Sequence, residues 1–384
     1  MADYVAPEPG LCPRVAITNS TTEYVVRFRL PLLNALREGG YDPVAVAPSD
    51  AYVGDLHSAG FSHFPLRLQG ASTGLVTELT ALRDLYHAYR QINPALALHF
   101  TPKVDIYGGL VARRLRIPFI NNLSGMGTAI TRGGWLGALV NGLLRSSQGR
   151  AAHVFVQNKD DRDHVLDRNI AQSHRLSVLP GSGIDLNAFP FTPLASTAPP
   201  ARPVHFVMIA RLVAEKGVNE FMEAAKAAHA QSSDIVFSIA GDVPSGHSGT
   251  VSESALQAWS ASPVMSWLGK VDDVRPLISD ADCVVLPSYR EGTPHVLLEA
   301  AAMGRPIIAA DSVGTREPLI DGQTGLLCEP RDSDDLADKM LEMLHLGPAR
   351  RAEMGQAGRR LMEQYYDVRL VVDAYMDKIR QILG

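Results

Sequence analysis

Two series of short apolar runs, each alternating with amphipathic segments, dominate this sequence of 384 residues. In the first series, runs rich in β-branched and other apolar residues predict strands at 15–18, 43–47, 95–99, 118–121 and 153–157. Between them, 29–38 before Gly39-Gly40 has the pattern of a helix. A second helix is predicted by apolar residues at helical spacing that would share one buried face: Leu75, Leu79, Leu82, Leu85, Tyr86 and Tyr89. This alternation is typical of βα units on a parallel sheet.

A composition break separates the two series. Residues 192–203 are rich in proline, alanine, serine and threonine and have no apolar period, so they predict a linker. After it, strands are expected at 204–209, 235–240, 283–287 and 306–310, with helices at 218–228, 295–303, 336–344 and from 350 onward. We therefore expect an α/β protein with two Rossmann-like domains. Because open α/β sheets bind ligands at the carboxyl ends of their strands, the cleft between the two domains is the expected site.

Composition narrows the functional class. The formal net charge of −5 gives no basic field for nucleic acid. The three cysteines, Cys12, Cys283 and Cys328, lack the spacing of a disulfide framework or a zinc site. Residues 1–14 have no signal-peptide core, and no run of about 18 apolar residues could span a membrane. We expect a cytoplasmic enzyme or binding protein.

The first chemical motif directly follows the strand that ends at 209. Arg211 and Lys216 lie at the mouth of this strand, and Gly217 precedes the next helix. Arginine can bridge two oxygens with a bidentate fork, lysine supplies a compact charge, and the helix start adds its positive end. The motif suits a diphosphate. The alternative is an exposed loop with two surface charges.

The second motif follows the strand at 283–287. Gly292 permits a tight turn, and Pro294 suits a helix start, so the backbone N–H groups near His295 would be available to an anion. Glu291 precedes this helix, and Glu299 lies within it, about two turns further along. Each carboxylate could accept hydrogen bonds from a sugar or ribose. The alternative for Glu299 is an exposed helix position, but its neighbours are mostly apolar, which indicates a buried carboxylate that needs partners.

These motifs resemble those of the retaining family 4 glycosyltransferases, which have the GT-B fold of two Rossmann-like domains facing across a deep cleft. The resemblance covers nearly the whole chain. Besides Arg211, the matching segments are Gly181-Ser182-Gly183-Ile184-Asp185 with Phe189, Glu215-Lys216-Gly217, Ala240-Gly241-Asp242, Leu268-Gly269-Lys270-Val271, Glu291 with Glu299, and 322–327. It implies an N-terminal acceptor-binding domain at 1–195, a nucleotide-sugar-binding domain at 204–364, and a helix at 365–384 that returns to the first domain.

The resemblance also implies roles in the donor site. Arg211 and Lys216 would bind the donor diphosphate, Glu291 the transferred sugar and Glu299 the ribose. The backbone near Lys270 would pair with the base. Together with Gly292, Thr293, Pro294 and His295, these residues form the expected site for a UDP-sugar, which is a substrate, and no cofactor is expected.

The N-terminal half is similar to the bacterial branch that extends polyprenyl-diphosphate-linked glycans, which includes N-acetylgalactosaminyltransferases. The similar segments are Phe28-Arg29 with Pro31-Leu32, 99–103 and 121–127. At two places in the expected acceptor region, the sequence departs from the usual pattern of the family. The usual Gly-Gly loop is replaced by Asn19-Ser20-Thr21-Thr22, and Ser124 stands where a histidine is expected. We therefore take His99 as a substitute catalytic residue, with an acceptor site at Asn19, Lys103, Ser124 and Gly125, although a lone histidine at a strand end is often structural.

An apolar segment flanked by arginines is predicted to contact a membrane surface. Its expected membrane contacts are Arg132, Trp135, Leu136, Leu139 and Arg145. The segment is too short to span a bilayer. Its alternative is a core helix, but a lipid-linked acceptor favours peripheral binding to the cytoplasmic face of the inner membrane.

Metal-independent transfer is expected. The acidic clusters Asp160-Asp161, Asp272-Asp273 and 332–335 precede or open predicted helices, which favours helix capping, and no histidine pair has metal-ligand spacing. Two other functions remain open: a UDP-sugar 2-epimerase of the same fold, and a catalytically silent sugar-nucleotide-binding subunit. A nicotinamide-dependent oxidoreductase is disfavoured, because no G-x-G-x-x-G follows the first strand.

Overall fold

The computed structural model describes residues 12–68, 75–125, 134–194, 202–243, 249–262 and 264–384. The chain forms two compact units. Unit 1 contains residues 1–182 and 369–384, and unit 2 contains residues 183–368.

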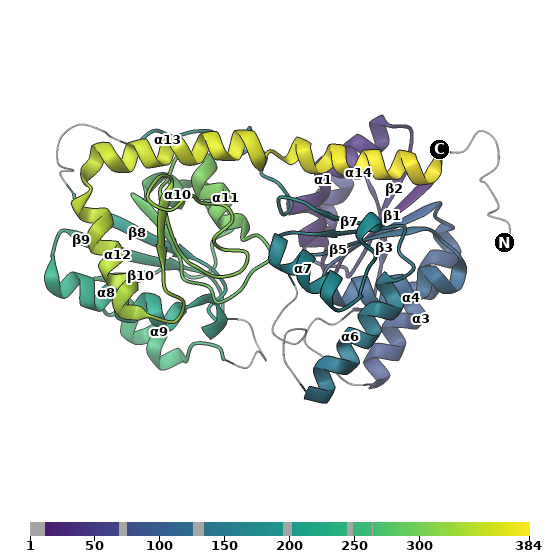
Figure 1. Cartoon of the computed structure of the whole chain (residues 1–384), viewed down its shortest axis with the longest axis horizontal. Coiled ribbons are helices and arrows are strands. Elements are labelled where there is room, and N and C mark those ends of the chain that lie inside the picture. The colour runs from purple at the N-terminus through teal and green to yellow at the C-terminus, as the bar shows by residue number, and fades with distance from the viewer. Residues whose placement is uncertain (1–11, 69–74, 126–133, 195–201, 244–248, 263) are drawn as a thin grey trace. The chain divides into compact units, whose positions relative to one another are not determined.

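Unit 1 is built on one parallel sheet of seven strands in the order β3-β2-β1-β4-β5-β6-β7 (Figure 1). The order reverses between β1 and β4, which pair with Thr18 beside His99. The strands are β1 (Arg14–Thr18), β2 (Asp42–Ala47), β3 (Ser62–Pro65), β4 (Leu96–Phe100), β5 (Phe119–Leu123), β6 (His153–Val156) and β7 (Leu176–Val178). The parallel sheet predicted for the first series is confirmed.

The helices of unit 1 bury one face each on this sheet. They are α1 (Thr22–Glu38), α2 (Val53–Ser58), α3 (Leu75–Ile92), α4 (Pro102–Leu115), α6 (Gly134–Gln148) and α7 (Lys159–Asp167). Helix α1 begins at Thr22, earlier than predicted, because the Thr21 hydroxyl accepts from the Tyr24 N–H and Pro31 is tolerated inside the helix. Leu79 of α3 is 66% exposed, so its predicted place on the buried face is wrong.

The C-terminal helix α14 (Val368–Leu383) completes the core of unit 1. Val371, Tyr375, Met376 and Ile379 are buried beside strand residues of β1 and β4. The Tyr375 hydroxyl also accepts a hydrogen bond of 2.8 Å from Nδ2 of Asn122 on β5. The last helix therefore belongs to unit 1, although all of unit 2 separates it in sequence from the rest.

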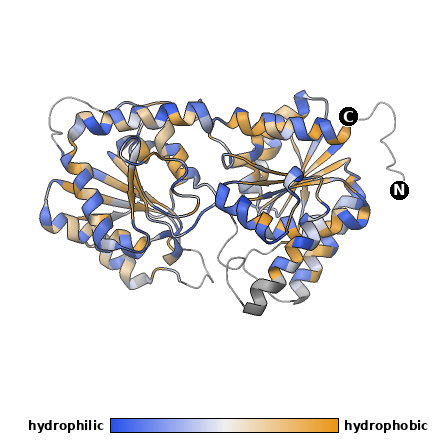
Figure 2. Cartoon of the chain, viewed as in Figure 1, coloured by the Kyte–Doolittle hydropathy of each residue, from blue (hydrophilic) through white to orange (hydrophobic). Residues whose placement is uncertain are grey.

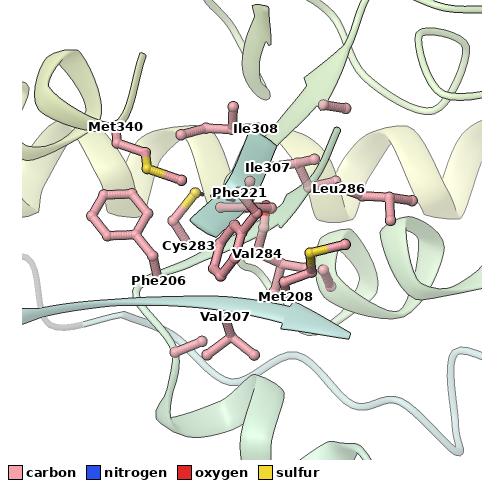
Figure 3. Packing of buried hydrophobic residues seen from close by; sticks show 14 of the residues in the cluster. Phe206, Val207, Met208, Phe221, Cys283, Val284, Leu286, Ile307, Ile308 and Met340 are labelled. Carbon is pink, nitrogen blue, oxygen red and sulfur yellow. Dashed lines mark hydrogen bonds between the residues drawn. The ribbon is translucent and has the colours of Figure 1, made fainter. Parts of the chain in front are cut away.

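Unit 2 repeats the architecture with six parallel strands in the order β10-β9-β8-β11-β12-β13. They are β8 (Val204–Ile209), β9 (Ile235–Ala240), β10 (Met265–Trp267), β11 (Cys283–Leu286), β12 (Ile307–Ala310) and β13 (Gly325–Cys328). Buried side chains of β8, β11 and β12 pack with Phe221 and Met340 (Figure 3). In both units the strands are hydrophobic and hydrophilic residues lie on the outer faces of the helices (Figure 2).

The helices of unit 2 are α8 (Val218–Gln231), α9 (Glu253–Ser260), α10 (Arg275–Asp280), α11 (His295–Ala302), α12 (Ser333–His345) and α13 (Gly347–Tyr365). The unit begins at Gly183, before the predicted boundary at 195. Ile184 is buried in its core, and the buried Arg305 donates to the Thr192 carbonyl, so the segment from Ile184 to the first residue of the predicted linker belongs to unit 2. Residues 195–201 of the predicted linker lie outside the described residues.

Candidate functional site

The candidate donor site lies where the strand order of unit 2 reverses. Strands β8 and β11 are parallel neighbours, with Phe206 beside Cys283 and Val207 beside Val284. Their carboxyl ends therefore open at the same edge of the sheet. This position, a topological switch point, is where open α/β sheets bind ligands. The loops that follow these two strands carry Arg211 with Lys216 and Glu291 with Gly292.

Direct backbone contacts hold the two loops together. The Tyr289 N–H donates to the Glu215 carbonyl over 3.0 Å. Gly217 has φ +73°, and a Cβ at this position would lie only 2.2 Å from the Pro287 carbonyl oxygen. Only glycine accommodates both this backbone conformation and this contact. The glycine that follows Lys216 in the sequence therefore lets one loop approach the other.

Lys216 and Glu291 form an ion pair between these loops. Their side chains are 20% and 15% exposed, so the pair is largely shielded from water. Ser288 Oγ lies 2.7 Å from Glu291 Oε1 and 3.1 Å from the Glu215 carbonyl oxygen. The two residues predicted to hold the diphosphate and the sugar thus touch each other, and a serine holds the carboxylate in place.

Arg211 supplies a cation at the same edge. Its side chain is exposed, and its guanidinium makes no hydrogen bond or ion pair with any other described residue. Lys270 is likewise exposed, on the loop after β10. That loop lies beside the one after β9, since the Gly241 N–H donates to the Gly269 carbonyl over 2.8 Å. Arg211 is therefore available to an anion arriving from solvent.

Helix α11 begins at the carboxyl end of β11 without a side-chain cap among the described residues. The loop before it is fixed, because the Glu291 N–H donates to the Val313 carbonyl over 2.8 Å. Gly314, at φ +88°, packs so closely that a Cβ there would lie 2.3 Å from the Glu291 carbonyl oxygen. Gly292 and Pro294 are buried, and Thr293 is partly exposed. The first amides of α11 have the orientation that favours anion binding.

Glu299 is partly buried and already has a partner. His295 Nδ1 lies 2.8 Å from Glu299 Oε1, one helical turn away. The expected buried carboxylate is thus partly exposed, and its partner comes from its own helix.

A second contact, which the sequence did not predict, holds the loop of Glu291 in place. The Tyr289 hydroxyl donates to Glu220 Oε1 of α8 over 2.6 Å, and the Arg331 guanidinium lies over the Tyr289 ring at 4.4 Å. Burial, helped by the bond to Glu220, raises the pKa of Tyr289 to about 12, so the hydroxyl stays protonated. Tyr289 is partly buried, and no signal in the sequence indicated its partner.

Comparisons with known proteins agree with this geometry. Residues 25–181 match the protein family described as glycosyl transferase 4-like domain, and residues 203–345 match the family described as glycosyl transferases group 1. The chain belongs to the family 4 glycosyltransferases. Its fold is GT-B, and it is an enzyme that transfers a sugar.

Several named proteins are similar along most of the chain. One is the N,N'-diacetylbacillosaminyl-diphospho-undecaprenol alpha-1,3-N-acetylgalactosaminyltransferase of Campylobacter jejuni, 24% identical over 86% of this chain and 89% of that protein. The capsular polysaccharide biosynthesis glycosyltransferase CapM of Staphylococcus aureus is 20% identical over 77% and 79%. Among solved structures, Anabaena HepE in complex with UDP and glucose aligns with a TM-score of 0.78 and 16% identity, covering 96% of this chain and 99% of that one.

In unit 1 of this glycosyltransferase, His99 lies inside the fold. It is fully buried, with Nε2 at 2.8 Å from the Tyr89 hydroxyl and Nδ1 at 2.6 Å from Asn121 Oδ1. Burial, opposed by the bond to Asn121, lowers its pKa from 6.5 to about 4. Thr18 extends the network through the Tyr89 hydroxyl. A histidine with both nitrogens bonded and no exposed surface cannot reach an acceptor, so this geometry argues against the predicted catalytic role and supports a structural one.

The other predicted acceptor residues follow strands β1, β4 and β5, but they are not all available to a ligand. Lys103 pairs with Glu78 over 2.9 Å, and Glu78 also accepts from the Tyr107 hydroxyl. Asn19 is 1% exposed, and its Oδ1 accepts from the Ser20 N–H. Ser124 and Gly125 are partly exposed after β5. Of this set, Ser124 and Gly125 are the better placed for an acceptor.

The predicted membrane segment includes helix α6. Arg132 and the side chains of Trp135, Leu136 and Leu139 lie outside the part of the chain that the structure describes. Arg145 is exposed, and its Nε donates to the Arg168 carbonyl over 2.9 Å. Leu144 is fully buried in the core of unit 1. Among the described residues, no helix is long and apolar enough to cross a membrane.

Two of the three acidic clusters accept from backbone N–H groups at helix starts, whereas Asp160 and Asp161 lie in the first turn of α7 without capping it. Asp332 accepts from the N–H groups of Asp334 and Asp335 at the start of α12, and Asp273 accepts from the Arg275 N–H at the start of α10. Helix α7 is capped by Asn158, which accepts from the Asp161 N–H. Within the described ranges, no group of three or more histidine, cysteine or acidic side chains is arranged to hold a metal ion. Metal-independent transfer stays a prediction.

Proposed function

We propose that this enzyme transfers an N-acetylhexosamine, such as N-acetylgalactosamine, from a UDP-sugar to a polyprenyl-diphosphate-linked saccharide, with retention of anomeric configuration. The reaction would take place with the enzyme bound peripherally to the cytoplasmic face of the inner membrane. The proposal places the nucleotide-sugar in unit 2 and the acceptor in unit 1.

The observation that carries the donor assignment is the ion pair of Lys216 and Glu291 at the switch point of unit 2. Arg211 lies on the same loop as Lys216 with its guanidinium exposed, and α11 begins on the same loop as Glu291. This edge of the sheet therefore combines two cations, helix amides and one carboxylate. A nucleoside diphosphate bound to a sugar offers the complementary groups, namely phosphate oxygens and sugar hydroxyls.

The chemistry follows from that arrangement. As the bond from the sugar to the diphosphate breaks, negative charge grows on the phosphate oxygens. Arg211, Lys216 and the α11 amides stabilise this charge without reorganising, which lowers the barrier. Lys216 can move from Glu291 to the phosphate when the donor binds, before this charge develops. Glu291 then accepts hydrogen bonds from the transferred sugar, and Glu299 from the ribose. The acceptor hydroxyl attacks on the face that the diphosphate leaves, and its proton passes to the oxygen of the departing phosphate, so that no protein nucleophile takes part.

The acceptor class is supported by similarity. The Campylobacter jejuni relative, named for an N-acetylgalactosaminyl transfer to a diphospho-undecaprenol-linked sugar, matches 86% of this chain and 89% of its own length. The match therefore includes unit 1, where the proposal places the acceptor.

The first test is a screen of UDP-sugars with a short polyprenyl-diphosphate-linked sugar, with products identified by mass. One UDP-N-acetylhexosamine should give a single-sugar extension.

Lys216→Ala should lower kcat/KM about 10²-fold or more with the fold intact, because it removes a charge that stabilises the transition state. Lys226→Ala, an exposed lysine on α8, is the matched control and should leave turnover unchanged.

Other outcomes identify the alternatives. Epimerisation of the UDP-sugar without acceptor would indicate a 2-epimerase. UDP-sugar binding without any turnover would indicate a silent subunit. Near-normal turnover by Lys216→Ala would show that the diphosphate assignment is wrong. Sedimentation with anionic vesicles tests the proposed membrane association separately.

A further inference from the structure

His295 and Glu299 occupy successive turns of α11 on its partly exposed side. His295 Nδ1 lies 2.8 Å from Glu299 Oε1, and the two side chains are 21% and 15% exposed. An ionised carboxylate can only accept, so the proton of this bond is on Nδ1, whether the ring is neutral or charged. Glu299 Oε2 makes no hydrogen bond to another described residue.

The histidine ring is held from a second direction. Phe189 packs edge-on against it, with centroids 6.4 Å apart and planes at 69°. Phe189 is itself fixed, because its N–H donates to the Asp185 carbonyl over 3.0 Å and its carbonyl accepts from Arg359 Nη1 over 3.0 Å. All of these residues belong to unit 2. His295 is thus confined between an aromatic ring and the carboxylate.

Helix α11 cannot rotate about its axis to point the Glu299 side chain in another direction. Leu297, Leu298, Ala300 and Ala301 are almost completely buried in the core of unit 2. The direction of the Glu299 carboxylate is therefore decided by its side-chain torsions. Because a glutamate loses substantial rotamer entropy when it is ordered, a partner that already orders it lowers the cost of ligand binding.

We infer that His295 is a positioning residue, which holds Oε1 of Glu299 so that Oε2 accepts from the ribose hydroxyls of the nucleotide. The inference rests on the proposed function and deepens it. His295 touches neither the sugar nor the reacting atoms in this role. It makes the ribose contact stronger by removing the freedom of the carboxylate.

A purely structural role of His295 predicts a different pattern of nucleotide affinities. An i,i+4 pair that only stabilises the helix would affect all nucleotides alike. A positioning role makes the effect of His295 depend on the ribose hydroxyls. His295→Asn separates the two further, because the asparagine amide can place an N–H close to the position of the Nδ1 proton, whereas leucine cannot.

The test measures binding of UDP and of 2′,3′-dideoxy-UDP to the full-length protein by titration calorimetry. We expect His295→Leu to weaken UDP binding about tenfold, the effect of losing one ordered charge-assisted hydrogen bond. Dideoxy-UDP binding should change less than twofold, and His295→Asn should recover most of the UDP affinity. In a Glu299→Ala background, His295→Leu should have no further effect on UDP.

Thermal unfolding of each variant checks that it is folded. Equal losses for UDP and dideoxy-UDP in a folded His295→Leu variant would overturn the positioning role while leaving the donor assignment intact. An additive loss in the Glu299→Ala background would overturn it as well. If the wild-type enzyme bound no UDP, the proposed donor itself would be wrong, and this inference would fall with it.

Discussion

Glu291 illustrates how single residues at this site depend on their neighbours. Its carboxylate contacts Lys216 from the loop after β8 and Ser288 from its own loop. Ser288 is fully buried, and its hydroxyl also lies within hydrogen-bonding distance of the Glu215 carbonyl. Ser288 therefore couples the position of the carboxylate to the contact between the two loops.

Ser288→Ala tests this coupling. Removing the hydroxyl leaves Oε1 of Glu291 with Lys216 alone and removes one link between the loops. We expect kcat to fall about tenfold and the free energy of unfolding to fall by about 1 kcal/mol, the usual contribution of one hydrogen bond. Steady-state kinetics and urea unfolding measure the two effects. Ser233→Ala, on an exposed turn after α8, is the control. Unchanged kcat in Ser288→Ala would contradict the coupling.

His99 makes the stability of unit 1 depend on pH. Its pKa is about 4 in the folded protein and about 6.5 when exposed, because burial disfavours the charged ring. Between these values the unfolded chain binds a proton that the folded chain excludes. The free energy of unfolding should therefore fall as pH falls from 6.5 towards 4, by at most about 1.4 kcal/mol per pH unit from this group.

His99→Gln removes this titration. The variant should be less stable than the wild type at pH 7, since the network to Tyr89 and Asn121 is disturbed. Its loss of stability between pH 7 and pH 5 should nevertheless be smaller than that of the wild type. Urea unfolding at both pH values measures the difference. Parallel losses in the two proteins would show that His99 is not the titrating group.

At the scale of elements, buried arginines satisfy the carbonyl ends of helices in unit 2. Arg305 donates to the Ile278 and Ser279 carbonyls at the end of α10 and to the Met303 carbonyl after α11. Arg351 does the same for the Met343 and Leu344 carbonyls of α12. The last carbonyls of a helix lack N–H partners within the helix, although Ile278 and Leu344 also accept from the cap residues Ala281 and Leu346. The arginines thus act as C-terminal caps supplied by other elements.

Arg305→Met should destabilise unit 2. Arg305 is 1% exposed, and methionine can replace its volume but none of its donors. Several buried carbonyls would lose their partner, so the free energy of unfolding should fall by about 3 kcal/mol or more. Denaturant unfolding followed by tryptophan fluorescence measures it. Arg275→Met is the control, because its pair with Asp273 is exposed and contributes little to stability. Equal effects in the two variants would contradict the capping role.

At the scale of the whole molecule, the chain returns to unit 1 only through α14. The helix buries Val371, Tyr375, Met376 and Ile379 in that unit. Each such side chain contributes about 1.5–3 kcal/mol. Their sum is comparable with the total stability of a domain, about 5–15 kcal/mol.

Truncation after Asp367 should therefore unfold unit 1 selectively. Hydrogen exchange should show loss of protection in β1, β4 and β5, while β8 and β11 keep theirs. Leu370→Ala in the full-length chain is the control, since Leu370 is exposed on α14. Equal loss of protection in the two units would contradict the assignment of α14 to unit 1 alone.

The sequence predicted much of this architecture because each strand and helix carries its own local pattern. The donor motifs were located for the same reason, since Gly217, Gly292 and Pro294 mark turns and helix starts directly. The predicted start of α1 at residue 29 was wrong, because the Thr21 cap lies further upstream and Pro31 lies inside the helix. Leu79 was misplaced because helical spacing does not show where a neighbouring element ends. His99 was taken for a catalyst because a lone histidine carries no sign of its burial.

What the sequence alone determined is the set of elements, the existence of two Rossmann-like halves and the residue types at the donor loops. These depend on interactions within a few residues. Only the tertiary structure decided which side chains meet. Lys216 pairs with Glu291 from 75 residues away, and Asn122 with Tyr375 from 253 residues away. Such pairs depend on strand order and on the burial it creates, because parallel strands bring together ends that the chain keeps far apart.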